Sequence, residues 1–138
     1  MALRANQTYV NLPVKDLSKS IEFFKTVGFE FNSQFTDDNA GCMVINENTF
    51  VMLLMEEFYK SFTKKEVTDT VSNSEVIMGL SAQSKQEVDE LVNKALAAGG
   101  KPANDPMDQG FMYAWSFHDI DGHLWELIYM DQSAIEHA

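Results

Sequence analysis

Glu126 is the residue whose type and neighbours in the sequence most suggest chemistry. It lies in the apolar run Leu124–Met130, where strand alternation puts it on one face with Leu124 and Ile128. A carboxylate among apolar side chains can act as a general base or hold a cationic ligand. The alternative is a strand carboxylate that is exposed or hydrogen-bonded and takes no part in catalysis. We predict that Glu126 faces a cavity, and it is our candidate catalytic residue.

Two histidines flank a predicted tight turn just before this strand. His118 and His123 lie on either side of Asp121-Gly122, a dipeptide typical of hairpins. With a turn between them, the two imidazoles are expected to point to different faces, which argues against a metal-binding pair. We interpret both as structural or surface residues, with His123 the nearer to the site and able to hydrogen-bond there.

Other candidates for ligand contact come from the alternation of two further strands. Tyr9 and Asn11 share the strand face opposite Leu12, so we expect them in the cavity, with a core role as the alternative. Tyr113 and Trp115 belong to an alternating aromatic set that would form a flat apolar wall, although packing is the more common use of such a set.

The single cysteine, Cys42, lies in a short apolar run without a basic neighbour. Nothing nearby lowers the pKa of its thiol, so we expect it to be buried and inert. One cysteine also excludes an intramolecular disulfide and a zinc site built from cysteines.

The elements that must position these residues follow one order twice. Apolar alternation, helical spacing and turn signals predict a strand, a helix and three strands in the first half, over 8–14, 17–27, 29–35, 41–45 and 49–55. The order restarts with a strand at 76–82, a helix between Ser84 and Gly99 with a Ser84/Glu87 capping box, at most a short edge strand in 101–108, and strands at 111–117 and 124–130.

The sequence therefore predicts an α+β protein made of two βαβββ modules. We place the modules at 1–55 and 75–138, with a connector at 56–74. Each module has one helix for one face of its sheet, so we expect curved mixed sheets that enclose a cavity. Aromatic residues early in the connector suggest a lid or part of a dimer contact.

Composition excludes several classes of partner. The chain has 138 residues, 21 of them acidic and 10 basic, with a formal charge of −11. Such a charge repels nucleic acid and anionic lipid surfaces. No run approaches 18 apolar residues and the start lacks a secretory apolar segment, so we expect neither membrane insertion nor export, and a cytoplasmic location.

Two segments resemble the vicinal oxygen chelate superfamily. They are LPVKDLS at 12–18 and FHDIDGHLWEL at 117–127, and the second is the more specific. The superfamily includes glyoxalase I, extradiol dioxygenases and the bleomycin and fosfomycin resistance proteins. The chain is most similar to a bacterial subgroup described as predicted lactoylglutathione lyase-related. The resemblance covers essentially the whole chain and implies the same two-module fold.

Metal-using members of that superfamily take one ligand from each of the first and last strands of both modules. The corresponding positions here are Tyr9, at or next to Leu53, Ile77 and Glu126. Only Glu126 is a typical metal ligand, and a lone carboxylate does not hold a divalent ion tightly. The resemblance therefore implies a member without a metal cofactor.

The resemblance also implies a homodimer, because members of that superfamily usually build their cavities from paired modules, often across chains. We expect the chain to bind a small organic molecule in a metal-free cavity, as the bleomycin-sequestering members do. One alternative is a glyoxalase-like lyase or isomerase that recruits a divalent metal through Glu126. Another is a metal-free acid or base enzyme that uses Glu126.

Overall fold

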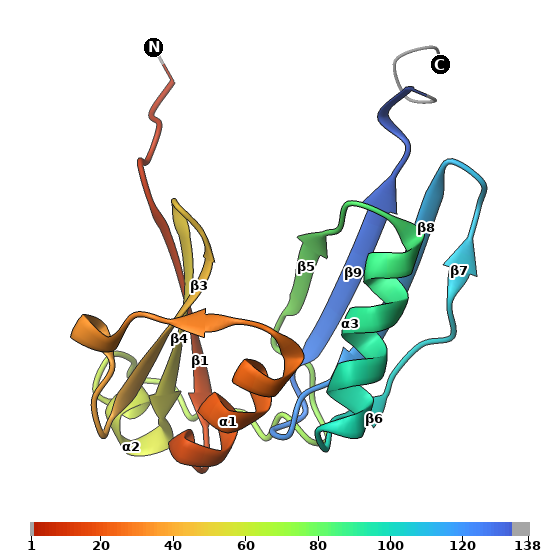
Figure 1. Ribbon diagram of the computed structural model, residues 1–138. Coiled ribbons are helices and arrows are strands. Elements are labelled where there is room, and N and C mark those ends of the chain that lie inside the picture. Colours follow the sequence, from red (N-terminus) through yellow and green to blue (C-terminus); the bar gives the residue numbers. More distant parts are fainter. Residues whose placement is uncertain (1, 134–138) are drawn as a thin grey trace. The chain divides into compact units, whose positions relative to one another are not determined.

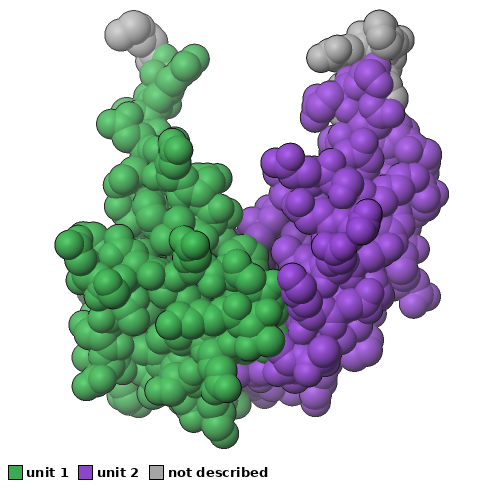
Figure 2. Space-filling view, in the orientation of Figure 1, with its two compact units in different colours: residues 1–68 green, residues 69–138 purple. Residues whose placement is uncertain are grey.

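The chain divides into two compact units, residues 1–68 and 69–138, which Figure 2 colours separately. The structure is a computed structural model and describes residues 2–133. The boundary between the units falls inside the stretch predicted as a connector.

The N-terminal unit has the predicted order of a strand, a helix and three strands (Figure 1). Its sheet runs in the order β1-β4-β3-β2, with β1 parallel to β4 and the other pairs antiparallel. The elements are β1 (Thr8–Val14), α1 (Leu17–Val27), β2 (Glu30–Phe31), a 3₁₀ turn η1 (Ser33–Phe35), β3 (Ala40–Asn46), β4 (Thr49–Met55) and α2 (Glu56–Lys60).

The C-terminal unit follows the same order, except that two short strands, β6 and β7, stand where the N-terminal unit has β2. Its sheet runs β5-β9-β8-β6, with β5 parallel to β9, while β7 also pairs with β8. The elements are β5 (Ile77–Ser81), α3 (Lys85–Ala97), β6 (Lys101–Pro102), β7 (Met107–Asp108), β8 (Met112–His118) and β9 (Leu124–Met130). The α+β class with two mixed sheets is therefore confirmed. Among the described helices, none has the length and apolar character needed to cross a bilayer.

Helix α1 begins and ends where its residues predict. The side chain of Asp16 accepts a hydrogen bond from the Lys19 backbone N–H, and Gly28 ends the helix at a φ of 126°. Its apolar stripe packs on one face of the sheet, where Leu12 and Leu53 are almost fully buried. The other face of this sheet is therefore turned away from α1.

Helix α3 is capped in a similar way. Ser84 Oγ accepts from the Glu87 N–H at 3.0 Å, and Glu87 Oε1 accepts in return from the Gln83 N–H at 3.3 Å. The helix covers the face of its sheet that carries Phe117 and Trp125, both fully buried, with rings stacked at 6.5 Å.

The segment 29–35 differs from the continuous strand that its alternating phenylalanines predict. Only Glu30–Phe31 pairs with β3, and the chain then turns into η1. The cause is Asn32, whose side chain accepts from the Gln34 N–H at 2.9 Å and so stabilises a turn in place of a strand. This turn brings Phe35 toward the face of the sheet away from α1.

Candidate functional site

A groove of about 530 Å³ lies on the N-terminal sheet, on the face turned away from α1. Strand register builds its floor, because Asn11 lies opposite Met52, and Met52 lies opposite Cys42 on the next strand. Tyr9 and Phe50 form the neighbouring row. The lining residues are Gln7, Tyr9, Asn11, Asn32, Phe35, Cys42, Phe50 and Met52.

Aromatic surface in this groove is unusually exposed for large apolar side chains. Tyr9 is 54% exposed and Phe35 is 64% exposed. The Tyr9 ring stacks on Phe50 with centroids 5.4 Å apart and planes at 19°. The Tyr9 hydroxyl donates to Gln7 Oε1 at 2.5 Å in an exposed contact. A preformed pair of stacked rings is suited to a flat apolar molecule.

Polar contacts in the groove come from side-chain amides. Asn11 makes no side-chain hydrogen bond within the described part of the chain. Asn32 uses its carbonyl oxygen to cap η1. Unengaged amide groups can donate to or accept from a ligand. Tyr9 and Asn11 thus lie together in one groove, as the alternation of their strand predicted, while their contact with a ligand stays a prediction.

Cys42 lies in the floor of the groove without the features of a nucleophile. It is 3% exposed, and burial raises the pKa of its thiol. At neutral pH the sulfur is therefore a protonated, apolar part of the floor.

Glu126 lies in the C-terminal sheet, on the face turned away from α3. It is opposite Gly79 on β5 and Ser116 on β8. Its side chain is half-buried and makes no hydrogen bond to another described residue. Strand alternation puts His118 on the same face, where its Nδ1 is buried without a hydrogen-bond partner among the described residues. The catalytic role of Glu126 stays a prediction.

Tyr113 and Trp115 do not join Glu126 in one wall. Odd-numbered positions of β8 face α3, because the Tyr113 hydroxyl donates to Asp89 Oδ1 of that helix at 2.5 Å. This bond, with burial and the nearby carboxylate charges, raises the pKa of Tyr113 to about 12. Both rings therefore lie on the α3 face of β8, and their contact with a ligand stays a prediction.

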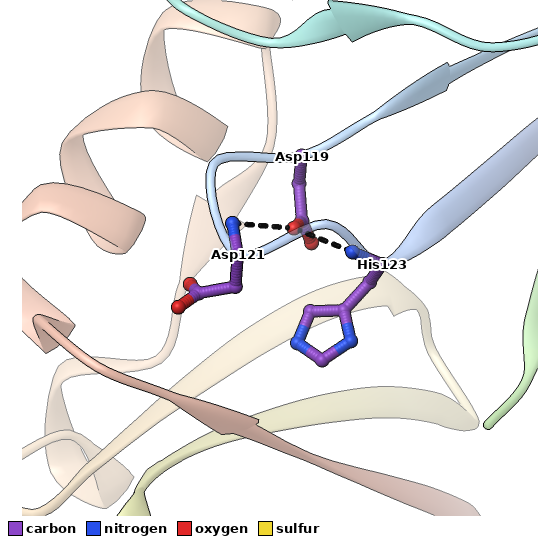
Figure 3. Close-up of side chains that lie close together, drawn as sticks. All are labelled: Asp119, Asp121 and His123. Atoms are coloured by element: carbon purple, nitrogen blue, oxygen red, sulfur yellow. Dashed lines mark hydrogen bonds between the residues drawn. The ribbon is translucent and has the colours of Figure 1, made fainter. Parts of the chain in front are cut away.

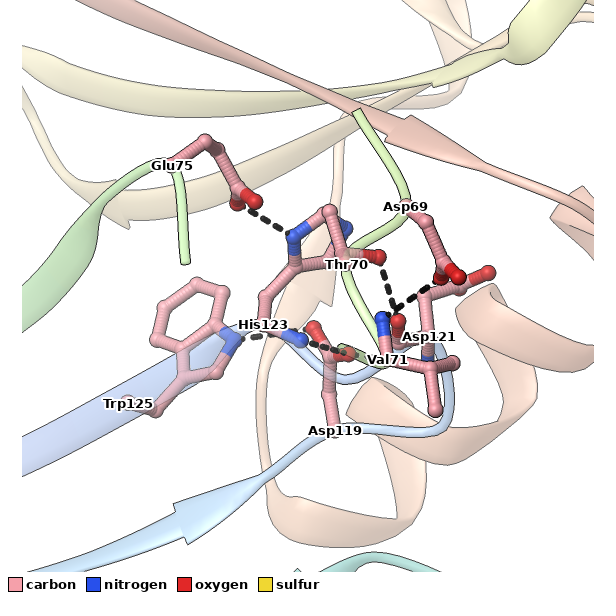
Figure 4. A network of polar contacts seen from close by, with 8 residues as sticks. All are labelled: Asp69, Thr70, Val71, Glu75, Asp119, Asp121, His123 and Trp125. Carbon is pink, nitrogen blue, oxygen red and sulfur yellow. Dashed lines mark hydrogen bonds and ion pairs between the residues drawn. The ribbon is translucent and has the colours of Figure 1, made fainter. Parts of the chain in front are cut away.

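His123 is 1% exposed and belongs to the turn between β8 and β9. Its Nδ1 lies 2.7 Å from Glu75 Oε1, and Figure 4 marks this contact with a dashed line. Thr70, also from the segment before β5, donates its hydroxyl to the Asp121 carbonyl at 2.5 Å. The predicted ligand contact of His123 stays untested, but these bonds give it a structural role.

Asp119 organises this turn. Its Oδ1 accepts from the backbone N–H groups of Asp121 and His123, which both point at the carboxylate in Figure 3. Its Oδ2 accepts from Trp125 Nε1 at 2.9 Å. Burial raises the pKa of this carboxyl group, while the neighbouring His123 and these N–H donors oppose the rise.

Asp119, Asp121 and His123 also have donor types suited to a divalent cation, with ligand atoms within 4.8 Å of one another. However, both oxygens of Asp119 already accept hydrogen bonds, and one nitrogen of His123 contacts Glu75. These hydrogen bonds give the cluster a structural role in the turn.

The four positions that correspond to ligands in the metal-using relatives fit a metal no better. Leu53 is fully buried on the α1 face, and Ile77 is an apolar side chain 59% exposed. The Tyr9 hydroxyl is bound to Gln7. Glu126 is the one remaining carboxylate, so this donor set does not fit a divalent ion.

Several residues of the groove were missed by sequence reasoning. Phe50 and Met52 line it because β4 pairs with β1 in parallel, a pairing between strands far apart in the sequence. Phe35 and Asn32 reach it through the 3₁₀ turn. Alternation in 49–55 offered a signal, since Phe50 and Met52 share one strand face.

Comparisons with known proteins agree with this architecture. A sequence model described as Glyoxalase/Bleomycin resistance protein/Dioxygenase superfamily matches residues 6–127. A hypothetical protein from S. aureus has a similar structure, with 30% identity, 94% of this chain and 95% of that chain covered, and a TM-score of 0.75. A search of curated proteins found no match.

More distant solved structures share the fold. A glyoxalase/bleomycin resistance protein/dioxygenase family enzyme from Burkholderia phytofirmans PsJN is 19% identical, with 91% of this chain and 99% of that chain covered and a TM-score of 0.75. The fosfomycin resistance protein FosX from Listeria monocytogenes, solved with Mn(II) and sulfate, is 19% identical over 100% of both chains, with a TM-score of 0.67.

Proposed function

Because the chain belongs to the Glyoxalase/Bleomycin resistance protein/Dioxygenase superfamily, we propose that it binds a small organic molecule without a metal ion. The proposed site is the groove on β1, β4 and β3. The observation that carries the proposal is the stack of the exposed Tyr9 ring on the half-buried Phe50 ring, in a hollow of about 530 Å³. Ligand sites combine such apolar walls with a few polar groups, which Asn11 and Asn32 supply here.

The alternative is a metal-dependent lyase or isomerase that uses Glu126. It is favoured by the similarity to FosX, which was solved with Mn(II). The residues Tyr9, Leu53 and Ile77 argue against it, because none supplies a ligand of the kind that such a site needs. Glu126 is also free of side-chain hydrogen bonds within the described residues, which would suit a metal-free acid or base enzyme.

Fluorescence titration with N-phenyl-1-naphthylamine tests the proposal. This neutral probe is weakly fluorescent in water and bright in an apolar site. We expect saturable binding of about one probe per chain, and a roughly tenfold weaker affinity in Tyr9→Ala, equivalent to about 1.4 kcal/mol, the upper range for one aromatic contact.

Phe111→Ala is the matched control, because Phe111 is an exposed aromatic residue, 45% accessible, that does not line the groove. It should bind the probe like the unsubstituted chain. Absence of saturable binding, or equal affinities in Tyr9→Ala and Phe111→Ala, would overturn the proposal.

A further inference from the structure

A second, smaller hollow of about 260 Å³ lies in the N-terminal unit beside the end of β4. Helix α2 follows β4 directly, as the labels in Figure 1 show, and contacts both β1 and β4. The hollow is lined by Asn11, Leu54, Tyr59, Phe62 and Thr63. Phe62 is 69% exposed, and its ring lies edge-on to Phe58 with centroids 5.0 Å apart.

Asn11 is the residue that the two hollows have in common. On one side of it lies the Tyr9–Phe50 stack, and on the other lie Tyr59 and Phe62. Its side-chain amide has no partner within the described residues, so it keeps one acceptor and two donor positions for a bound molecule. A polar group between two apolar regions favours a ligand that has a polar group between two apolar parts.

Charge is missing from both linings. The chain as a whole has a formal charge of −11, yet none of the residues 2–133 that line either hollow is Asp, Glu, Lys, Arg or His. An anionic ligand would meet no cationic side chain in the lining, so nothing would offset the free-energy cost of removing its charge from water. A cationic ligand would find no carboxylate in the lining. The lining therefore selects uncharged molecules.

We propose that the ligand is an uncharged molecule with two apolar, preferably aromatic, parts joined by one hydrogen-bonding group. One part lies against Tyr9 and Phe50, the joining group meets Asn11, and the other part lies against Tyr59 and Phe62. This inference rests on the proposed function of the larger groove. It adds the class of ligand and the second hollow.

Three related probes test the inference. N-phenyl-1-naphthylamine has two aromatic parts joined by an N–H group, 1-naphthylamine has one aromatic part, and 8-anilino-1-naphthalenesulfonate adds a negative charge to the two-part probe. We expect the neutral two-part probe to bind at least tenfold more tightly than either of the others, measured by fluorescence or by competition.

Variants then locate the two parts. Phe62→Ala should weaken binding of the two-part probe about fivefold and leave 1-naphthylamine unchanged, since the smaller probe fits the Tyr9 side alone. Asn11→Ala should weaken the two-part probe by a similar factor. Phe111→Ala serves again as the control. Asn11 and Phe62 are both exposed, so we expect both variants to fold.

The outcomes separate this inference from the proposed function. One outcome would contradict the second hollow and the ligand class alone. In that outcome 1-naphthylamine binds in a Tyr9-dependent way, the two-part probe binds no more tightly than 1-naphthylamine, and Phe62→Ala leaves the affinity of the two-part probe unchanged. Equal or tighter binding of the sulfonate overturns the preference for uncharged ligands. If neither neutral probe binds, the proposed function itself fails.

Discussion

The two units share one order of elements, yet the faces turned away from their helices differ in chemistry. In the N-terminal unit this face carries stacked aromatic rings and neutral amides. In the C-terminal unit strand alternation places Glu126, Ser116 and His118 there. The helix-covered faces are apolar in both units. Packing against a helix constrains one face of each sheet, while the other face is free to acquire a different function.

The corresponding turns differ as well. Between β3 and β4, Asn46 Oδ1 accepts from the Asn48 N–H at 2.9 Å in an exposed turn. Between β8 and β9, Asp119 is 3% exposed and accepts three N–H groups. The same type of bond, from a backbone N–H to a side-chain oxygen two residues earlier, is therefore exposed in one unit and buried in the other.

The largest effect is expected from Asp119→Ala. It removes the acceptor for two backbone N–H groups and for Trp125 Nε1, all in a buried turn. Unsatisfied buried donors cost about 1–3 kcal/mol each, so we expect the free energy of unfolding to fall by at least about 3 kcal/mol in urea denaturation. Asn46→Ala, the control in the exposed turn, should lose less than about 1 kcal/mol. Equal losses in the two variants would contradict the contrast between the turns.

A smaller effect is expected from Gly122→Ala. Gly122 has a φ of 93°, and a Cβ there would overlap the backbone carbonyl of Thr70. Gly110→Ala is matched, because Gly110 has a φ of 85° and open space around it. We expect backbone strain to lower the free energy of unfolding by about 1–2 kcal/mol in both variants. In Gly122→Ala the overlap should lower it by about 1–3 kcal/mol more. If thermal unfolding gave both variants the same stability, residue 70 would not pack closely on the turn.

The smallest effect is expected at Tyr113, which distinguishes the helix-covered face from the groove. Its pKa of about 12 lies above the value of about 10 expected for an unfolded chain. The folded state thus holds this proton more tightly, so the stability from the Tyr113–Asp89 hydrogen bond is present below pH 10 and lost as the pH rises through about 12.

Absorbance at 295 nm and alkaline unfolding together measure this contribution. The Tyr113→Phe variant should lack the ionisation near pH 12 and lose less stability between pH 10 and 12. If Tyr113→Phe instead removes an ionisation near pH 10, the ordinary value for tyrosine, Tyr113 does not bond to α3.

Local signals in the sequence were sufficient for much of the fold. Asp16, Ser84 and Gly28 mark helix ends, because capping depends on neighbours within a few residues. Asp121-Gly122 marked the hairpin for the same reason. Segment 29–35 was misjudged, since the side-chain cap of Asn32 competed successfully with strand pairing.

The candidate site was less predictable, because it depends on which strands pair and which face a helix covers. Alternation placed Tyr9 and Asn11 correctly on one face. The same alternation left open whether Tyr113 faced a cavity or α3, and its bond to Asp89 decides for α3. The role of Asp119 was missed, because its three donors converge only when the turn closes.

The most direct test of the central claim is titration of the chelator-treated chain with N-phenyl-1-naphthylamine, in parallel with Tyr9→Ala and Glu126→Gln. Binding in a metal-free groove on β1, β4 and β3 predicts saturable binding that resists the chelator and Glu126→Gln and weakens about tenfold in Tyr9→Ala. Binding that requires added Mn²⁺ and disappears in Glu126→Gln would contradict the account and support the metal-dependent alternative.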